Sequence, residues 1–136
     1  MRSIKSILVA SAVTVAAAPM AFSPVLAQAV SRITFAKGND NASVTGSINS
    51  RQYRDYKLRV GAHQSLGVSL ITEGNAYFNI LPPGSKDVAV YNSSTNGNDA
   101  TGIETVAGDY TIRVYLMGAA KYSKKPVSYQ LSVSVM

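Results

Sequence analysis

Residues 109–133, DYTIRVYLMGAAKYSKKPVSYQLSV, contain two runs in which apolar and polar side chains alternate. A period of two is typical of a β-strand that buries one face and exposes the other. Ile112 in the first run and Leu131 in the second are therefore expected core residues. Nine residues, GAAKYSKKP, separate the two runs. We interpret the whole stretch as a β-hairpin with a long, basic tip.

The same alternation recurs along the rest of the chain. Turn-forming residues interrupt it every eight to twelve residues or so, and Pro83–Gly84 suits the centre of a type II turn. Tyr56, Tyr110 and Tyr129 fall on apolar strand faces and are expected in the core. This rhythm predicts an all-β protein: a single antiparallel β-sandwich, jelly-roll-like, with about eight to nine short strands. Further strands are expected at 31–36, 43–49, 53–60, 66–70, 77–81, 87–92 and 101–106.

The first 27 residues have the composition of a secretory signal peptide rather than of a folded segment. Arg2 and Lys5 precede an apolar stretch at 7–20, and small residues follow at the positions that a signal peptidase requires. We predict cleavage after Ala27, with Ala29 as the alternative, which leaves one domain at 28–136. The mature chain is expected in the periplasm or outside the cell, with no membrane insertion after cleavage.

Charge and cysteine content limit the possible functions. The full chain has a formal net charge of +6, and removal of Arg2 and Lys5 leaves 11 basic and seven acidic residues, a net +4. This charge suits acidic partners, but export argues against nucleic acid as a target, and we predict no nucleic-acid binding. The absence of cysteine excludes disulfides and a lipid-modified N-terminal cysteine.

The residues offer little chemistry for catalysis. His63 is the only histidine and falls in the predicted turn GAHQ, so cysteine–histidine and zinc mechanisms lack their components. The carboxylates lie in turns or on polar strand faces, where raised pKa values are difficult to arrange. The asparagine-rich loops lack the carboxylate spacing of calcium loops. We therefore expect no enzymatic activity, no metal site and no cofactor.

Several motifs, taken in order, resemble a known family. They are FAKG at 35–38, the segment from YRDY at 53 to PPGS at 85, VAGDYTIRVYLM at 106–117 and SYQLSVSV at 128–135. This set resembles the periplasmic inhibitors of g-type lysozyme and, more broadly, the bacterial pre-peptidase C-terminal (PPC-like) β-sandwich. The similarity covers about residues 32–135.

The resemblance implies an inhibitor that docks protruding loops into the substrate cleft of a lysozyme. Gly108 and Tyr110 match the family's S-G-x-Y motif, and Tyr53 and Tyr56 match its first long strand. Ala107 stands where that motif has serine, and GAAK at 118–121 stands where the inhibitors carry arginine. Arg51 occupies a turn position where the inhibitors favour an aromatic residue.

The predicted partner-binding surface combines the 118–126 tip with two turns that we expect beside it. Lys121 and Tyr122 are the expected leading contacts, whereas Lys124 and Lys125 are expected to act by long-range attraction. A lysozyme cleft is lined by carboxylates, so a basic loop would meet complementary charge there. The two turns contribute Gly108, Asp109 and Tyr110, and Arg51 and Tyr53.

Two alternatives remain open from the sequence. The lysines of the tip also suit a solvated hairpin end that protects a sheet edge from aggregation. The domain also suits a non-inhibitory PPC-like module that binds envelope glycan or an exported protein.

Overall fold

The computed structural model describes residues 29–136, so the predicted signal peptide at 1–27 lies outside the described residues. The described chain forms nine strands, one α-helical turn and one 3-10 helix. The elements are β2 Ala29–Arg32, β3 Asn41–Ile48, β4 Tyr53–Val60, β5 Ser65–Thr72, β6 Ala76–Leu81, β7 Tyr91–Asn92, α1 Ser93–Asn96, β8 Asp99–Glu104, β9 Gly108–Leu116, η3 Gly118–Tyr122 and β10 Val127–Val135.

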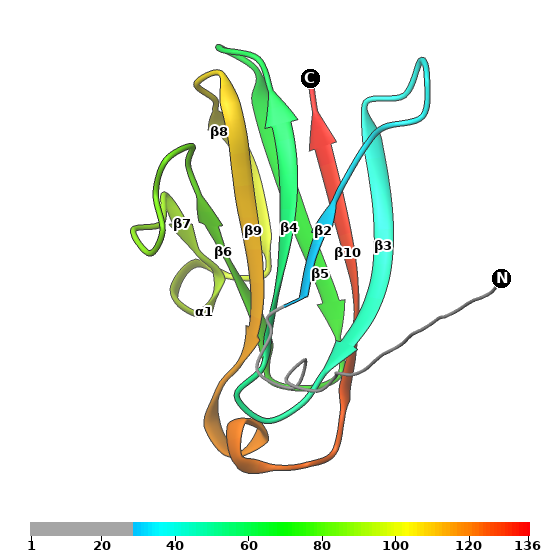
Figure 1. Cartoon of the computed structure of the whole chain (residues 1–136), viewed down its shortest axis with the longest axis vertical. Helices are drawn as coiled ribbons and strands as arrows, with labels where there is room; N and C mark the ends of the chain where they lie inside the picture. Colours follow the sequence, from blue (N-terminus) through cyan, green and yellow to red (C-terminus); the bar gives the residue numbers. More distant parts are fainter. Residues whose placement is uncertain (1–28) are drawn as a thin grey trace, which may run out of the picture.

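The strands form two sheets that face each other across one core (Figure 1). One sheet has the order β3-β10-β5-β8 and the other β2-β4-β9-β6-β7. From β3 to β10, every connection except β6–β7 passes from one sheet to the other, which is the jelly-roll arrangement. The predicted all-β, jelly-roll-like sandwich is therefore confirmed. One pairing differs from the antiparallel prediction, because β2 runs parallel to β4.

The core lies between the inner faces of the two sheets. Ile112 and Leu131 are fully buried, as their alternation predicts, and so are the rings of Tyr56, Tyr110 and Tyr129. The hydroxyls of Tyr56 and Tyr129 lie 2.7 Å apart and form a hydrogen bond between the two sheets. Gly46 makes room for this pair, since a Cβ there would lie 2.6 Å from the Tyr129 hydroxyl. Burial raises the pKa of Tyr129, which keeps its phenol protonated.

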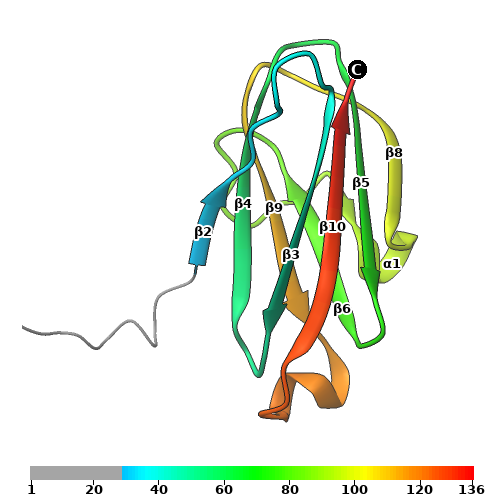
Figure 2. The same ribbon diagram turned by 90° about the vertical axis from the view of Figure 1, so that its right-hand side faces the viewer.

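The predicted hairpin at 109–133 is wrong. β9 pairs with β4 and β6, whereas β10 pairs with β3 and β5 in the opposite sheet. Alternation shows only that each strand buries one face. Two such strands can lie side by side in one sheet, or they can lie in opposite sheets with their buried faces packed against each other. Residues 117–126 therefore bridge the two sheets at one end of the sandwich (Figure 2).

Local predictions also differ from the structure in places. Only Tyr91–Asn92 of the predicted strand 87–92 is extended in a sheet, because a hydrogen-bonded turn between Ser85 and Val88 precedes it. The first strand lies slightly earlier than predicted, at 29–32. The type II turn is confirmed: Gly84 has φ 82°, and the Ser85 amide donates to the Pro82 carbonyl at 3.1 Å.

Among residues 29–136, no helix is long and apolar enough to cross a membrane.

Candidate partner-binding site

The connection between β9 and β10 is an ordered bridge rather than a hairpin tip. Gly118 starts η3 with φ 65°, a conformation that favours glycine. Just before it, the Met117 amide donates to the Asn75 carbonyl at 3.0 Å, which ties the connection to the β5–β6 turn. At the end of η3 the Ser123 amide donates to the Ala120 carbonyl at 3.3 Å. The backbone of the connection is therefore anchored at its start and closed on itself by this helical turn.

The β3–β4 turn at 49–52 fastens the connection from the side. The Asn49 side-chain amide donates to the Lys124 carbonyl at 3.1 Å, and the Ser50 hydroxyl donates to the Ser123 carbonyl at 2.9 Å. Ser50 itself has a left-handed backbone, with φ 56°. The structure thus brings this turn and the connection together, as predicted. We call residues 49–52, 73–75 and 117–126 the connection end.

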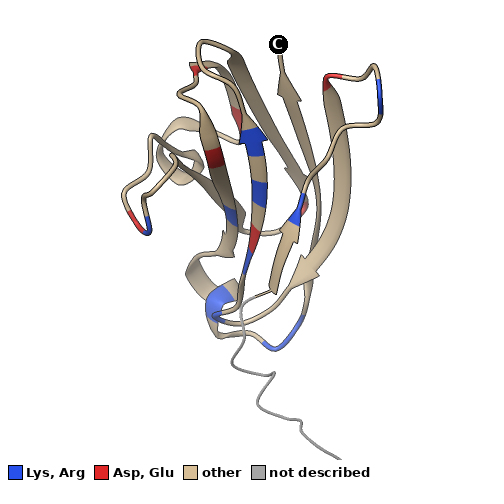
Figure 3. Ribbon diagram, turned by 45° about the horizontal axis from the view of Figure 1, so that its top comes forward, with Lys and Arg blue, Asp and Glu red and all other residues tan. Residues whose placement is uncertain are grey.

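A basic and aromatic pair marks the outer surface of the connection end. The Arg51 guanidinium lies 5.1 Å from the centre of the Tyr122 ring, within the range of a cation–π contact. Tyr122 is 70% exposed, and Arg51 is exposed as well. Figure 3 shows blue, basic positions along this connection, and residues 117–126 include no acidic side chain. The pair thus offers an aromatic face and a cation to a partner.

A shallow hollow of about 350 Å³ lies beside this pair on the five-stranded sheet. Lys121 is half-buried and also lines the hollow, so it brings a second basic side chain to it. Apolar parts of Leu116 and Met117 form part of its wall. The residues that line the hollow are Arg51, Gln52, Tyr53, Tyr115, Leu116, Met117 and Lys121.

The strand side of the hollow is rigid. The Arg113 guanidinium lies 4.4 Å from the centre of the Tyr53 ring and donates two hydrogen bonds to Asp55, at 2.8 and 2.9 Å. This hydrogen-bonded carboxylate raises the pKa of Arg113. Tyr53, Tyr115 and Tyr77 lie opposite one another on β4, β9 and β6. Tyr53 and Tyr115 line the hollow, and Tyr77 continues this row of half-exposed tyrosines beyond it.

Lys124 and Lys125 lie on the other side of the connection. Both are exposed, and the Lys125 amide is fixed by the Ser123 hydroxyl at 3.0 Å. Lys125 borders a larger open groove of about 970 Å³ that also includes Ile71 and Glu73. Lys121 and Lys125 thus border different surfaces, which supports separate roles for the two parts of the connection.

The predicted residues Gly108, Asp109 and Tyr110 do not lie near the connection, so the prediction that they form one surface with it is wrong. Gly108 pairs with Val60, at the opposite end of β9 from Tyr115. A nine-residue strand spans about 27 Å at 3.3 Å per residue, which separates the two groups. The prediction failed because it placed a strand's two ends on one surface.

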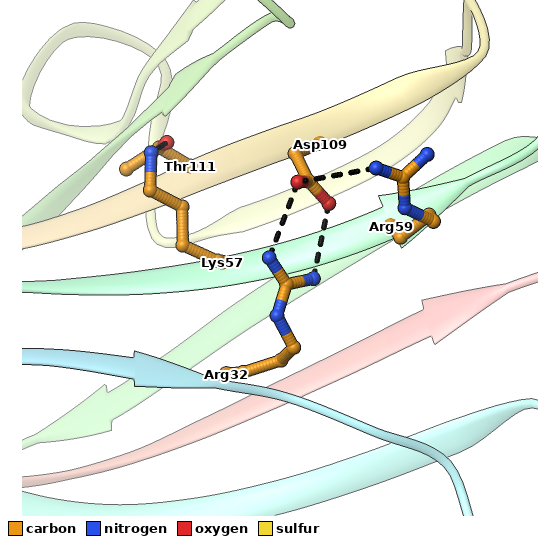
Figure 4. Close-up of polar contacts among 5 residues, drawn as sticks. All are labelled: Arg32, Lys57, Arg59, Asp109 and Thr111. Carbon is orange, nitrogen blue, oxygen red and sulfur yellow. Dashed lines mark hydrogen bonds and ion pairs between the residues drawn. The ribbon is translucent and has the colours of Figure 1, made fainter.

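The groups at that far end are already occupied. Asp109 accepts two hydrogen bonds from Arg32, at 3.0 and 3.1 Å, and lies 3.6 Å from Arg59 (Figure 4). The Arg32 guanidinium lowers the pKa of Asp109. Tyr110 is 2% exposed, and its hydroxyl accepts from the Val106 amide at 3.1 Å. We call Arg32, Arg59 and residues 108–110 the Asp109 end.

Sequence reasoning missed the residues that hold the connection in place. Asn49, Ser50 and Asn75 make side-chain or backbone contacts between turns that are distant in sequence. Their only signal was the clustering of small polar residues in turns, which does not specify a partner. Within residues 29–136, no group of three or more His, Asp or Glu side chains is arranged to hold a metal ion.

Neither a protein-family model nor a curated protein sequence matches the chain. Solved structures do match its fold. The PliG protein of Aeromonas hydrophila, a periplasmic lysozyme inhibitor of g-type lysozyme, superposes with a TM-score of 0.74 and is 28% identical, covering 79% of this chain and 96% of that one. Salmonella Typhimurium PliG, described in the same words, gives a TM-score of 0.64 at 23% identity, covering 81% and 100%.

A further match is the pre-peptidase C-terminal domain of collagenase from Bacillus anthracis. Its TM-score is 0.61 at 18% identity, covering 79% of this chain and 97% of that domain. The resemblance to the g-type inhibitors and to the PPC-like sandwich is therefore confirmed.

Proposed function

We propose that the protein is an exported inhibitor of g-type lysozyme that inserts its connection end into the substrate cleft of the enzyme. The observation that carries the proposal is the likeness to Aeromonas hydrophila PliG over 96% of that chain, joined to an ordered, basic and aromatic loop at one end of this sandwich. Inhibition of this kind protects peptidoglycan and needs no catalytic group in the inhibitor. Periplasmic location follows from the predicted signal peptide and from the location of the PliG proteins.

The order of the connection supports binding without a large entropic cost. Asn49 and Ser50 hold two carbonyls of the connection, and Asn75 holds its start. A loop that is fixed before binding loses little conformational freedom when it docks. Tyr122 adds a large contact area with only two side-chain torsions to fix.

The charges of the connection end suit a cleft lined by carboxylates. Lys121 and Arg51 border the same hollow, and neither has an acidic partner among the described ion pairs. The family resemblance implies arginine at 118–121, and this chain has none there. Arg51 can provide the guanidinium from the neighbouring turn, since it lies against Tyr122.

A second candidate function is the binding of envelope glycan without inhibition. The row of Tyr53, Tyr115 and Tyr77 supports it, because aromatic side chains in line across a sheet provide apolar faces for sugar rings. Arg113 already covers part of Tyr53, however, and the single proton of the Tyr115 hydroxyl is shared between the side-chain oxygens of Asn79 and Asn92, at 3.1 and 3.2 Å. The row is therefore partly engaged within the protein, which favours the inhibitor proposal.

Lysis of a cell-wall suspension tests the two candidates together. The mature protein, mixed with g-type, c-type and i-type lysozymes in turn, should stop lysis by the g-type enzyme at near-equimolar dose. Insoluble peptidoglycan without enzyme should not sediment it. Full lysis at a tenfold molar excess over the g-type enzyme would contradict the inhibitor proposal, and co-sedimentation with peptidoglycan alone would favour glycan binding.

A further inference from the structure

The two sheets have four edge strands, and three of them carry features that prevent pairing with another strand. β2 has four residues and ends at the charged Arg32, and β7 has only two residues. β8 is irregular, because its register with β5 shifts between Leu66 and Val68, and it carries Asp99 and Glu104. Short length, charge and a bulge are the usual means by which proteins protect sheet edges.

β3 has none of these features. It is eight residues long and pairs with β10 in unbroken register from Ile48↔Val127 to Asn41↔Ser134. Its sequence, NASVTGSI, contains no charge and no proline. Within residues 29–136 no other strand pairs with it, and Figure 1 shows it at the margin of the sandwich. A long, regular, uncharged edge is the kind that pairs with another chain.

The hydrogen bond between the Val135 amide and the Asp40 carbonyl, at 2.9 Å, shows which backbone groups face this open edge. These two residues lie opposite each other, so Asp40 and every second residue after it direct their backbone groups toward β10. Asn41, Ser43, Thr45 and Ser47 therefore direct their N–H and C=O groups to the open edge.

The inner side of β3 is also incompletely covered. Ala42 and Val44 face the core side yet are only half-buried. On the adjacent strand β10, which has a neighbour on both sides, Leu131 is 0% and Val133 1% exposed. A further strand beside β3 would cover this apolar surface.

We propose that a second copy of this chain occupies the edge, with β3 pairing antiparallel to β3 around a two-fold axis at Thr45. The register places Ser43 opposite Ser47 and Thr45 opposite itself, which forms about six backbone hydrogen bonds between the copies. On the inner side it places Val44 opposite Gly46 and Ala42 opposite Ile48, so each larger side chain meets a smaller one. The alternative axis at Val44 would oppose Val44 to itself and leave Ile48 without a partner.

The chemistry of the edge favours a second copy over a foreign peptide. A two-fold pairing requires that the strand complement itself, and an uncharged strand with hydroxyls on one face and alternating large and small residues on the other does so. Hydroxyl-bearing residues pair favourably across strands, as Ser43 and Ser132 already do at 2.9 Å.

The dimer forms one eight-stranded sheet from two four-stranded sheets and places the two connection ends at opposite poles. The connection end lies past the Ile48 end of β3, whereas the axis passes through its middle. Both connections stay accessible in the dimer. The proposal therefore does not rest on the proposed function, and each can fail alone.

Engineered cysteines test the axis directly, because the native chain has none. Thr45→Cys should form a disulfide-linked dimer under mild oxidation, since the two Cα atoms would lie about 5.5 Å apart. Ser43→Cys and Ser47→Cys, on the same strand face, should each remain unlinked alone and should link when the two variants are mixed. Equal linkage of all three single variants, or no linkage of Thr45→Cys, would overturn the proposal.

Sedimentation of the mature protein over a range of concentrations tests the dimer without cysteines. The native chain should change from one to two copies in mass as concentration rises. Thr45→Pro should keep the fold, because the lost N–H faces the open edge, and should abolish the dimer. Val44→Pro is the matched control, since it removes an N–H that faces β10 and should lower the melting temperature. A native monomer at every concentration, or a dimer that persists in Thr45→Pro, would contradict the pairing.

Discussion

The two ends of the sandwich place similar residues in different surroundings. Each end has an arginine close to a tyrosine-bearing strand or loop. At the Asp109 end, Asp109 forms ion pairs with Arg32 and Arg59. Tyr110 is buried there, and its hydroxyl accepts a hydrogen bond from the backbone. At the connection end, Arg51 lies on an exposed aromatic ring with no acidic side chain in the connection.

This difference shows that residue type alone does not identify a binding surface. A charged group that is already paired inside the protein gives up that pair before it can bind a partner, and the exchange yields little free energy. The cations of the connection end have no such pair. The comparison therefore directs the search for the binding residues to one end.

The largest expected effect comes from a substitution in the hydrophobic core, which supports both ends of the sandwich. Ile112→Ala should lower the free energy of unfolding by about 2–5 kcal/mol, because Ile112 is completely buried in the middle of β9. Chemical denaturation followed by circular dichroism measures this loss. The exposed Ile71→Ala, on β5, is the control and should change stability by less than about 0.5 kcal/mol.

The alternation of the sequence predicted this core well. Ile112, Leu131 and Tyr110 are buried because each occupies the apolar phase of a period-two pattern. The pattern could not assign the strands to sheets, since the inner faces of both sheets have the same composition. Residues 118–126 were therefore predicted as a hairpin tip, although they lie in the connection that joins the two sheets. A two-residue Asn–Gly turn could not replace them, because packed sheets lie about 10 Å apart.

Only those parts of the candidate site that depend on short stretches of sequence could be predicted. The turn that contains Arg51 and the loop that contains Tyr122 were both identified from their composition, and the structure brings them into contact. The position of Asp109 depended on the direction of β9 and on pairing with β4, which the sequence does not encode locally. Asn49 and Ser50 contact carbonyls more than 70 residues away, and no short motif specifies such contacts.

The second largest effect should appear at the connection end alone. Tyr122→Ala or Lys121→Ala should weaken binding to g-type lysozyme by about 1–3 kcal/mol, mainly through faster dissociation, if these side chains enter the cleft. Surface plasmon resonance against immobilised enzyme measures both rates. Asp109→Ala, at the other end, is the control, and an equal loss there would show that the two ends were assigned to the wrong roles.

A smaller effect should follow from charge reversal beside the contact. Lys124→Glu combined with Lys125→Glu should slow association by about tenfold at low salt and reduce the dependence of the rate on ionic strength, because exposed charges act mainly by attraction over distance. Dissociation should stay close to that of the native protein. Rates measured at several salt concentrations would contradict the assignment if dissociation, rather than association, carried the change.

The smallest expected effect concerns pH at the Asp109 end. The guanidinium of Arg32 lowers the pKa of Asp109 below its ordinary value near 3.8, so the folded protein favours the ionised carboxylate. The stabilisation is therefore complete at pH values above that ordinary value and disappears as the pH falls through the lowered one.

Because the ion pair between Asp109 and Arg32 is open to solvent, its contribution to stability is modest. Asp109→Asn should melt slightly below the native protein at pH 7, and the difference should shrink as the pH falls below 3.8. Inhibition at pH 7 should be unchanged, since the affected pair lies about 27 Å from the connection. A melting difference that does not shrink as the pH falls would show that the variant acts through packing, and a loss of inhibition would extend the binding surface to both ends of the sandwich.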